Sequence, residues 1–401
     1  MRLEDIGYFT YPLMRRHHKS QKRMAKPEAT HAPANVSTST SIGTSPDQLI
    51  KLPRVAEEVT ASWLARVLEA KVKSLKVDKI LPGAASKLYV TVEYEAEDDV
   101  NGDETASRPT HLCIKGGFNT SFIQQVPWVV MIYQREVEFF NRLAPSLDRM
   151  EIPKSWWAGC NAEQGIVIMD NLATRGCEFG DPTEVWPVSR VLAGIEQLAA
   201  LHAKTWGVKP SDFPWLTSDY DLAILSLMET YDAVVHSPGR PEVHDYLKSQ
   251  ERIMTATKKH YASRNPKFQC LLHGDPHTGN TYLDKGAPRF LDWQMIHIGS
   301  AFHDVAYFIG GALSIEDRRA HEWEIVDHYL TTLETMGAPA FSSKQEDVMQ
   351  EYRKSFLAGI GWIMCPYEMQ PEECVQAMAV RYAAALDDHR TLELIESLPD
   401  I

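Results

Sequence analysis

Cysteine is scarce in this chain, and no two cysteines are closely spaced. Six occur among 401 residues, at positions 113, 160, 177, 270, 365 and 374, and none forms a Cys-x-x-Cys pair. Thiolate zinc sites and disulfide frameworks both depend on grouped cysteines, so this spacing argues against either. It favours reduced thiols and a cytoplasmic location. Cys113 and Cys270 lie in apolar runs, which predicts that both are core residues.

Long apolar runs and an excess of positive charge are also absent from the sequence. Stretches such as Ala306 to Leu313 are too short to cross a bilayer. The formal net charge of −13 argues against a general nucleic-acid binder. A hydrophobic content of 44% and a charged content of 24% are typical of a soluble globular protein. We therefore expect neither a membrane span nor a nucleic-acid partner. The oligomeric state cannot be read from the sequence.

The first 48 residues differ in composition from the rest. They contain a basic segment between Arg15 and Lys26 and a stretch rich in Ser and Thr between Ser37 and Ser45. A secretory apolar segment is missing. This composition predicts a disordered tail. A mitochondrial targeting segment is the alternative, and Glu4 and Asp5 near the start count against it.

Two aspartates and an asparagine follow one another at a spacing suited to metal-assisted phosphoryl transfer. Residues 273–280 read His-Gly-Asp-Pro-His-Thr-Gly-Asn, and Asp292-Trp293 begins twelve residues after Asn280. In such a reaction one carboxylate accepts the proton of the attacking hydroxyl. An amide oxygen and a second carboxylate hold Mg²⁺ against the nucleotide phosphates. Asp275 is therefore the candidate base, and Asn280 and Asp292 are the candidate magnesium ligands.

The residues around the motif predict a strand, a loop and a hairpin. The apolar run 268–272 enters the motif, and its glycines and proline then break regular structure. Residues 280–283 read as a second short strand, 284–288 as a turn, and 289–291 as a return strand. A hairpin of this size can return Asp292 to the neighbourhood of Asn280, as a shared metal ion requires.

The combined pattern resembles the aminoglycoside phosphotransferase and choline kinase group of enzymes. His-Gly-Asp-x-His-x-x-Asn followed by Asp-Trp is similar to the group's catalytic and metal motifs. Asp292-Trp293-Gln294 and residues 303–308 resemble in particular the ecdysteroid-kinase-like, or CHK, branch. The resemblance covers roughly residues 75 to 390. It implies an α+β, bilobal protein-kinase-like fold with a small β-rich N-terminal lobe and a larger, mainly helical C-terminal lobe. It also implies ATP as the phosphoryl donor.

Two other interpretations of the motif stay open. His273, His277 and His303 could be ligands in a metal-dependent hydrolase, because imidazole and carboxylate groups suit zinc and di-metal sites. The fold could also belong to a catalytically weak pseudokinase or scaffold that binds nucleotide. The joint presence of Lys115, Asp275, Asn280 and Asp292 counts against this second alternative.

The predicted N-terminal lobe contains several candidate nucleotide-binding residues. A small-residue turn that includes Gly83 and Ser86 joins two predicted strands, and its backbone N–H groups could cover phosphates. A third strand is predicted over residues 111–116, with Lys115 near its end. In the group that this sequence resembles, a lysine at the position of Lys115 forms ion pairs with the phosphates. A glutamate from a helix holds that lysine in place. The resemblance further implies that the main chain near Met169 contacts the adenine.

Helical geometry selects the glutamate that should pair with Lys115. A helix is predicted over residues 130–144, with Tyr133, Val137 and Phe140 on its buried face. Glu136 lies beside this apolar stripe, whereas Glu138 lies nearly opposite. A carboxylate on an apolar face is costly unless it is paired. Glu136 is therefore the predicted partner of Lys115.

The remaining expectations concern the C-terminal lobe. Residues 1–48 form the expected tail, 49–169 the N-terminal lobe, and 170–401 the catalytic and acceptor-binding lobe. His202 continues an apolar helical stripe, which predicts a hydrogen-bonded core histidine, and His303 and Asp304 are expected to stabilise the catalytic loops. The acceptor is expected to be a small molecule with a hydroxyl group. Four residues could line its pocket or simply pack in the core: Trp362, Met364, Tyr367 and Met369.

Overall fold

The computed structural model describes residues 50–95, 108–216 and 219–399. The predicted N-terminal tail, residues 1–48, lies outside this described part. From Leu52 onward, the described residues belong to one compact unit. The boundary between two lobes at residues 169 and 170 stays a prediction. All six cysteines are free, and Cys113 and Cys270 are buried as predicted.

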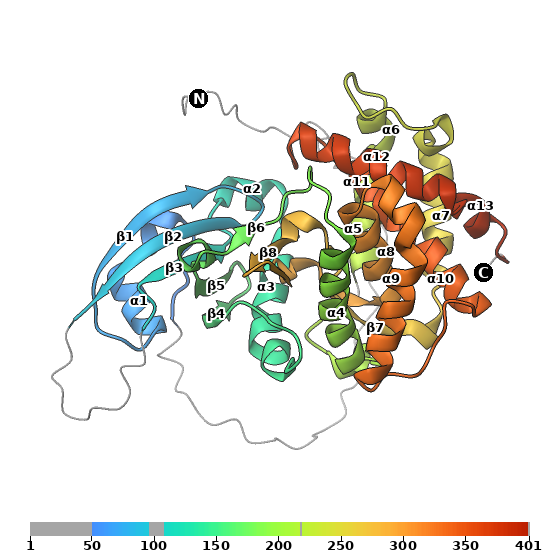
Figure 1. Cartoon of the computed structure of the whole chain (residues 1–401). Helices are drawn as coiled ribbons and strands as arrows, with labels where there is room; N and C mark the ends of the chain where they lie inside the picture. Colours follow the sequence, from blue (N-terminus) through green and yellow to red (C-terminus); the bar gives the residue numbers. More distant parts are fainter. Residues whose placement is uncertain (1–49, 96–107, 217–218, 400–401) are drawn as a thin grey trace, which may run out of the picture. The chain divides into compact units, whose positions relative to one another are not determined.

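An antiparallel sheet of five strands makes up the first part of this unit. Its strand order is β1-β2-β3-β5-β4. Alternating apolar residues of β2 point into the core, and β3 and β5 are buried along almost their whole length. The strands are β1 (Val72–Leu81), β2 (Ser86–Tyr94), β3 (His111–Gly116), β4 (Ser155–Cys160) and β5 (Gly165–Asp170), shown on the left of Figure 1.

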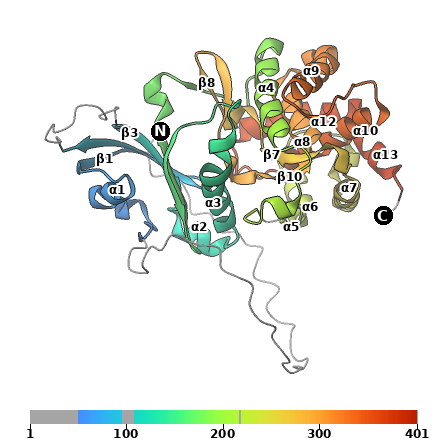
Figure 2. The same ribbon diagram turned by 90° about the horizontal axis from the view of Figure 1, so that it is seen from below.

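Three helices accompany the sheet: α1 (Ala61–Val67), α2 (Thr120–Gln125) and α3 (Val129–Glu138). Helix α3 packs against β4 and β5 and lies beside the sheet in Figure 2. Its buried residues include Tyr133 and Val137, as the apolar stripe predicted. The α-helix ends at Glu138, before the predicted end at residue 144, because the chain continues as a π-helical turn over Phe139–Leu143.

The second part of the unit is mainly helical. Its helices are α4 (Val188–Lys204), α5 (Tyr220–Leu227), α6 (Tyr231–Val235), α7 (Gln250–Ala262), α8 (Ala301–Ala312), α9 (Ile315–Thr335), α10 (Glu346–Ser355), α11 (Ile360–Ile363), α12 (Glu372–Asp388) and α13 (Thr391–Glu396). Every residue of α8 is buried, and α4, α9, α10 and α12 pack around it. Gly194 allows α4 to approach closely, because a Cβ there would lie 2.5 Å from the Phe308 ring.

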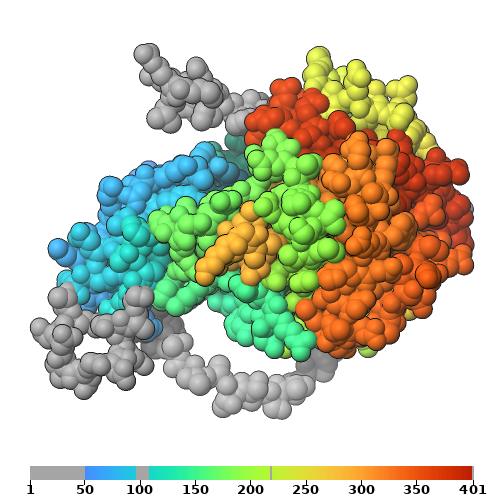
Figure 3. Space-filling model, in the orientation of Figure 1, coloured from blue at the N-terminus to red at the C-terminus, as the bar shows by residue number. Residues whose placement is uncertain are grey.

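Five short strands carry the predicted motif. Strands β7 (Gln269–Leu272) and β10 (His297–Ser300) form one antiparallel pair. Strands β6 (Glu178–Phe179), β8 (Thr281–Asp284) and β9 (Ala287–Phe290) form a three-stranded sheet. The predicted strand–loop–hairpin order is therefore confirmed. The gold β8–β9 hairpin reaches the surface between green segments in Figure 3.

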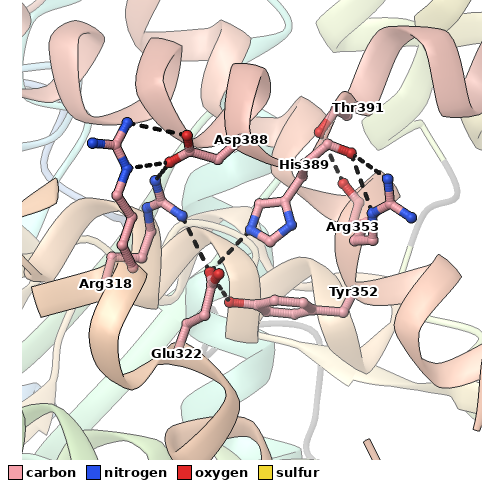
Figure 4. A network of polar contacts seen from close by, with 8 residues as sticks. Arg318, Glu322, Tyr352, Arg353, Asp388, His389 and Thr391 are labelled. Carbon is pink, nitrogen blue, oxygen red and sulfur yellow. Dashed lines mark hydrogen bonds and ion pairs between the residues drawn. The ribbon is translucent and has the colours of Figure 1, made fainter. Parts of the chain in front are cut away.

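A buried polar network ties the C-terminal helices together (Figure 4). The Glu322 carboxylate of α9 accepts hydrogen bonds from Arg318 Nη1 at 3.2 Å, His389 Nε2 at 2.9 Å and Tyr352 Oη at 3.4 Å. Arg318 also pairs with Asp388 at the end of α12. Because each buried charge has partners, the network joins α9, α10 and α12 without leaving an isolated ion.

The fold prediction is confirmed. A β-rich part precedes a larger helical part, as in the bilobal protein-kinase-like fold. Among the described residues, no helix is long and apolar enough to cross a membrane.

Candidate active site

The loop that follows β7 is held by a buried aspartate of α8. The main-chain N–H groups of His273 and Gly274 donate to Asp304 at 2.7 and 3.0 Å. Burial alone would raise the pKa of Asp304, but its hydrogen bond with His202 and the neighbouring imidazoles lower the pKa to about 2. The carboxylate is thus kept ionised as an acceptor. His202 is a hydrogen-bonded core histidine, as predicted.

Gly274 is required for the shape of this loop. Its φ is +85°, a conformation that residues with a side chain rarely adopt. A Cβ at this position would lie 2.1 Å from the carbonyl oxygen of Met295. The loop therefore packs directly against the segment that follows Asp292. His303 Nε2 lies 3.3 Å from the Gly274 carbonyl, so both His303 and Asp304 support the loop, as expected from the sequence.

Two hydrogen bonds fix the orientation of the Asp275 carboxylate. Tyr307 Oη donates to Oδ1 and Asn280 Nδ2 donates to Oδ2, each at 3.0 Å. Burial raises the pKa of Asp275 to about 7, although the hydrogen bond from Tyr307 opposes this rise. About a third of the side chain is exposed, so solvent screens part of the burial effect. The exposed part of the carboxylate can be reached from solvent.

The β8–β9 hairpin returns the chain to the loop. Leu291 N donates to the Asn280 carbonyl at 2.8 Å, which places Asp292 beside the end of the motif. Asp292 has a φ of +64°, in the left-handed region that Asp and Asn tolerate best among non-glycine residues. Burial opposes the charge of Asp292, but Lys115 and Lys87 outweigh it and lower the pKa to about 2.

Lys115 joins the N-terminal sheet to the Asp292 segment. Its Nζ lies 2.8 Å from Glu136 Oε1 and 3.0 Å from Asp292 Oδ1. The predicted ion pair with Glu136 is therefore present. Although burial opposes a charge here, the carboxylates of Asp292 and Glu136 raise the pKa of Lys115. Glu138 instead pairs with Arg142 near the surface.

Helix α3 also contacts the Asp292 segment directly. Glu136 Oε1 accepts a hydrogen bond from Trp293 N at 3.2 Å, and Arg135 Nη1 donates to the Gln294 carbonyl at 3.3 Å. The rings of Phe139 and Trp293 stack with centroids 4.0 Å apart. Helix α3 thus fixes both the partner of Lys115 and the backbone that carries Asp292.

Lys87 is a second cation at this site, and no motif in the sequence pointed to it. It lies directly opposite Lys115 in the β2–β3 ladder, so the two side chains share one face of the sheet. Among the residues that the structure describes, no carboxylate forms an ion pair with Lys87. Like charges opposite each other in a ladder are unfavourable unless an anion lies nearby. Only the strand register reveals this pair, since 28 positions separate the two lysines in sequence.

The remaining predicted nucleotide-binding residues lie on the same sheet. Gly83 is exposed in the turn between β1 and β2, and Ser86 is the buried first residue of β2, opposite Gly116. Met169 is buried in β5. Tyr133 of α3 donates to the carbonyl of Ala84, which ties the turn to this helix. Their contacts with a nucleotide stay predictions.

The histidines of the motif are engaged with the backbone rather than grouped for a metal. His273 Nε2 lies 2.8 Å from the Leu291 carbonyl, and its Nδ1 accepts a hydrogen bond from Asp275 N at 3.3 Å. His277 Nδ1 accepts a hydrogen bond from Gly279 N at 3.1 Å. Within the described ranges, no group of three or more His, Cys, Asp or Glu side chains could hold a metal ion. This arrangement gives the hydrolase interpretation no support.

Asn280 and Asp292 do fit a magnesium ion shared with phosphates. Among the described residues, the hydrogen bonds of the Asn280 side chain use its nitrogen and go to Asp275. This leaves its amide oxygen without a partner in the described part of the chain. Amide and carboxylate oxygens are the hard donors that Mg²⁺ prefers, and in nucleotide sites one or two protein ligands suffice. The donor set is therefore adequate for such an ion.

The four candidate acceptor-pocket residues do not share one environment. Trp362 is buried, and its ring meets His277 edge to face with centroids 5.1 Å apart. Met364 is buried in the main core, whereas Met369 is 55% exposed. Tyr367 donates to the Gly239 carbonyl at 2.6 Å. Of these four residues, Trp362 contacts the motif through His277, and the acceptor pocket stays a prediction.

The model of the ecdysteroid kinase-like family matches residues 85–338, well over half of the chain. The chain belongs to the ecdysteroid kinase-like family. The branch that the motif suggested is therefore confirmed, and the matched range includes Lys115, Glu136, Asp275, Asn280 and Asp292.

One curated relative and several solved structures are also similar. A kinase-like protein of Caenorhabditis elegans is 23% identical over 222 residues, which cover 52% of this chain and 57% of that protein. The chain thus spans little more than half of this relative's length. The choline kinase LicA of Streptococcus pneumoniae is 12% identical, with a TM-score of 0.46 over 84% of this chain and 99% of that one. An ethanolamine kinase of Plasmodium vivax is 13% identical, with a TM-score of 0.45 over 79% of this chain and 83% of that one.

Proposed function

We propose that this family member is an ATP- and Mg²⁺-dependent phosphotransferase that acts on a hydroxyl group of a small molecule. One observation carries the proposal. An oriented aspartate and an amide oxygen of the motif loop lie together with the carboxylate of Asp292 and the ion-paired lysine of β3, so three separate segments meet. Phosphoryl transfer depends mainly on positioning and on neutralising phosphate charge, and these residue types supply both.

Each residue has a distinct role in the proposed reaction. Asp275 accepts the proton of the acceptor hydroxyl as its oxygen forms a bond to the γ-phosphorus, and the bond from phosphorus to the ADP oxygen breaks. Asn280 and Asp292 would hold Mg²⁺, which would neutralise charge on the phosphates. Lys115, held by Glu136, binds phosphate oxygens, and Lys87 adds a second positive charge. The turn with Gly83 and Ser86 covers the phosphates, and the main chain at Met169 contacts the base.

The proposed acceptor is a small molecule rather than a protein. The motif reads His-Gly-Asp where protein kinases have His-Arg-Asp, and Asp-Trp-Gln where they have Asp-Phe-Gly. The predicted acceptor site lies in the helical part of the chain, near Asp275. A nucleotide-binding pseudokinase is the alternative, and it differs from the enzyme only in lacking transfer.

A pooled screen tests the proposal and identifies the acceptor. The protein is incubated with Mg·ATP and mixtures of aminoglycosides, amino alcohols, sugars and steroid alcohols, and phosphorylated products are detected by mass spectrometry. We expect at least one product with the natural chain and none with Asp275→Asn. Asp284→Asn, at the half-buried end of β8, is the matched control and should retain the product. Transfer only to proteins would contradict the small-molecule acceptor.

A further inference from the structure

Two adjacent residues of α12, Arg381 and Tyr382, reach the surroundings of the predicted catalytic loop. Helix α12 (Glu372–Asp388) packs on α8 and lies outside the range matched by the family model. Arg381 is 6% exposed and Tyr382 is fully buried. Each makes hydrogen bonds to the main chain of another segment, and each of those segments contacts the loop.

Two chains of contacts, or routes, connect α12 to the loop. The first route runs from Tyr382 to the carboxylate of Asp275. Tyr382 Oη donates to the Tyr307 carbonyl at 2.5 Å, and the two rings stack with centroids 5.2 Å apart. Tyr307 in turn donates to Asp275 Oδ1 at 3.0 Å. Tyr307 therefore has both its ring and its backbone fixed by Tyr382, while its hydroxyl orients the carboxylate.

The second route runs from Arg381 to the other side of the loop. The guanidinium donates to the carbonyls of Pro182 and Gly311, and to the Glu184 carbonyl at 3.2 Å. Among the described residues, its hydrogen-bond partners are all main-chain carbonyls. Arg381 therefore acts as a clamp, a side chain that links separate segments through their backbones without forming an ion pair.

The clamped segment lies directly against the catalytic loop. Thr278 Oγ1 donates to the Asp181 carbonyl at 3.2 Å, and Gly180 N donates to the Thr281 carbonyl at 3.2 Å. A Cβ at Gly180 would lie 2.1 Å from the Thr278 carbonyl oxygen, so the two backbones are in contact. Residues 180–184 thus connect Arg381 to both ends of the Thr278–Thr281 turn.

Helix α12 is itself anchored at its far end. Asp388 pairs with Arg318 and Arg319 of α9, within the network of Figure 4. This anchor fixes the helix without touching the catalytic loop. It also supplies a matched control, because Arg319 contacts α12 but neither route.

We propose that Arg381 and Tyr382 are positioning residues that hold the Asp275 loop in its reactive arrangement from two sides. The expected change in kcat rests on the proposed function, whereas the expected change in amide exchange does not. A catalytic group must be held to a fraction of an ångström, and the residues that support it largely decide whether it is. Without these clamps, the loop and residues 180–184 would retain their neighbours in α8 and β8 but lose their tie to α12.

Hydrogen–deuterium exchange on the full-length chain tests the structural part. Arg381→Gln is compared with the natural chain and with Arg319→Gln. We expect amide exchange in residues 180–184 and 273–281 to rise by about tenfold in Arg381→Gln. Exchange in β1 and β2 should stay unchanged. Arg319→Gln should match the natural chain in both active-site segments. Tyr382→Phe removes one hydroxyl and should raise exchange in residues 273–281 alone. If Arg381→Gln fails to fold, Tyr382→Phe provides the test in its place.

Kinetics test the second part with the acceptor found by the screen. Arg381→Gln and Tyr382→Phe should each lower kcat by about tenfold while leaving the KM for ATP unchanged. Unchanged exchange and unchanged kcat in folded Tyr382→Phe would overturn the inference. If the natural chain transfers no phosphoryl group, the proposed function fails. The exchange data alone then decide whether α12 holds the loop.

Discussion

At the scale of single residues, the site is defined by how each charge is satisfied. Asp275 keeps an oriented carboxylate because Tyr307 and Asn280 each occupy one oxygen. The sequence predicted Asp275, Asn280 and Asp292 because they share one motif. It could not reveal the role of Tyr307, which is 32 residues away, or of Lys87, because only tertiary contacts and strand register bring them to the site.

Replacing Asp275 should separate chemistry from nucleotide binding. Asp275→Asn keeps the size of the side chain but removes the proton acceptor. We expect kcat to fall by about 10²-fold or more, with ATP affinity nearly unchanged. Steady-state kinetics and ATP titration measure the two effects. Near-normal turnover by this variant would refute the assignment of Asp275 as the base.

The two glutamates of α3 provide an internal comparison. Glu136 is buried against Lys115, whereas the side chain of Glu138 is 23% exposed and pairs with Arg142. Glu136→Gln should weaken ATP binding on the order of tenfold, equivalent to about 1.4 kcal/mol. Glu138→Gln should leave it unchanged. Isothermal titration with Mg·ATP measures both, and equal effects would contradict the proposed role of Glu136.

At the scale of elements, the β8–β9 hairpin and α3 bring the proposed metal-binding residues together. The sequence predicted the hairpin from its turn residues and β3 from its apolar run, and both are confirmed. The predicted helix ran beyond the end of α3, because the apolar spacing continues through the π-helical turn at Phe139–Leu143. Spacing alone does not distinguish an α-helix from a π-helical turn, since both keep apolar residues on one face.

A substitution at Asp292 tests its proposed role as a metal ligand without disturbing the backbone of the hairpin. Asparagine tolerates the left-handed conformation at this position, so Asp292→Asn removes a charge and adds no strain. The increase in melting temperature that ATP produces in the presence of Mg²⁺ should be lost in this variant. Asp284→Asn, on the same hairpin, should keep it. A Mg²⁺-dependent increase of natural size in Asp292→Asn would exclude Asp292 as a ligand.

At the scale of the whole molecule, buried polar networks hold the helical part together behind the site. The motif and its order along the chain were enough to predict the fold. The network around Glu322 was not predictable, because its members come from distant helices with no shared motif. The same holds for Arg381 and Tyr382.

Removing Glu322 should destabilise the chain without altering the site. Glu322→Ala leaves Arg318 and His389 without a shared acceptor in a buried position. We expect the free energy of unfolding to fall by about 3 kcal/mol, measured by urea denaturation. Glu324→Ala, an exposed position on the same helix, should have little effect. Equal stabilities of the two variants would show that the network contributes little.

The central claim is that these residues transfer the γ-phosphoryl group of ATP, and one measurement addresses it directly. The protein is incubated with ATP labelled at the γ or the α phosphate, with Mg²⁺ or with EDTA, and with the pooled hydroxyl compounds. We expect label in a small-molecule product from γ-labelled ATP only, and this label should depend on Mg²⁺ and be lost in Asp275→Asn. Binding of Mg·ATP with no transfer to any compound would contradict it and favour a pseudokinase. Stoichiometric zinc with no ATP binding would instead favour a hydrolase.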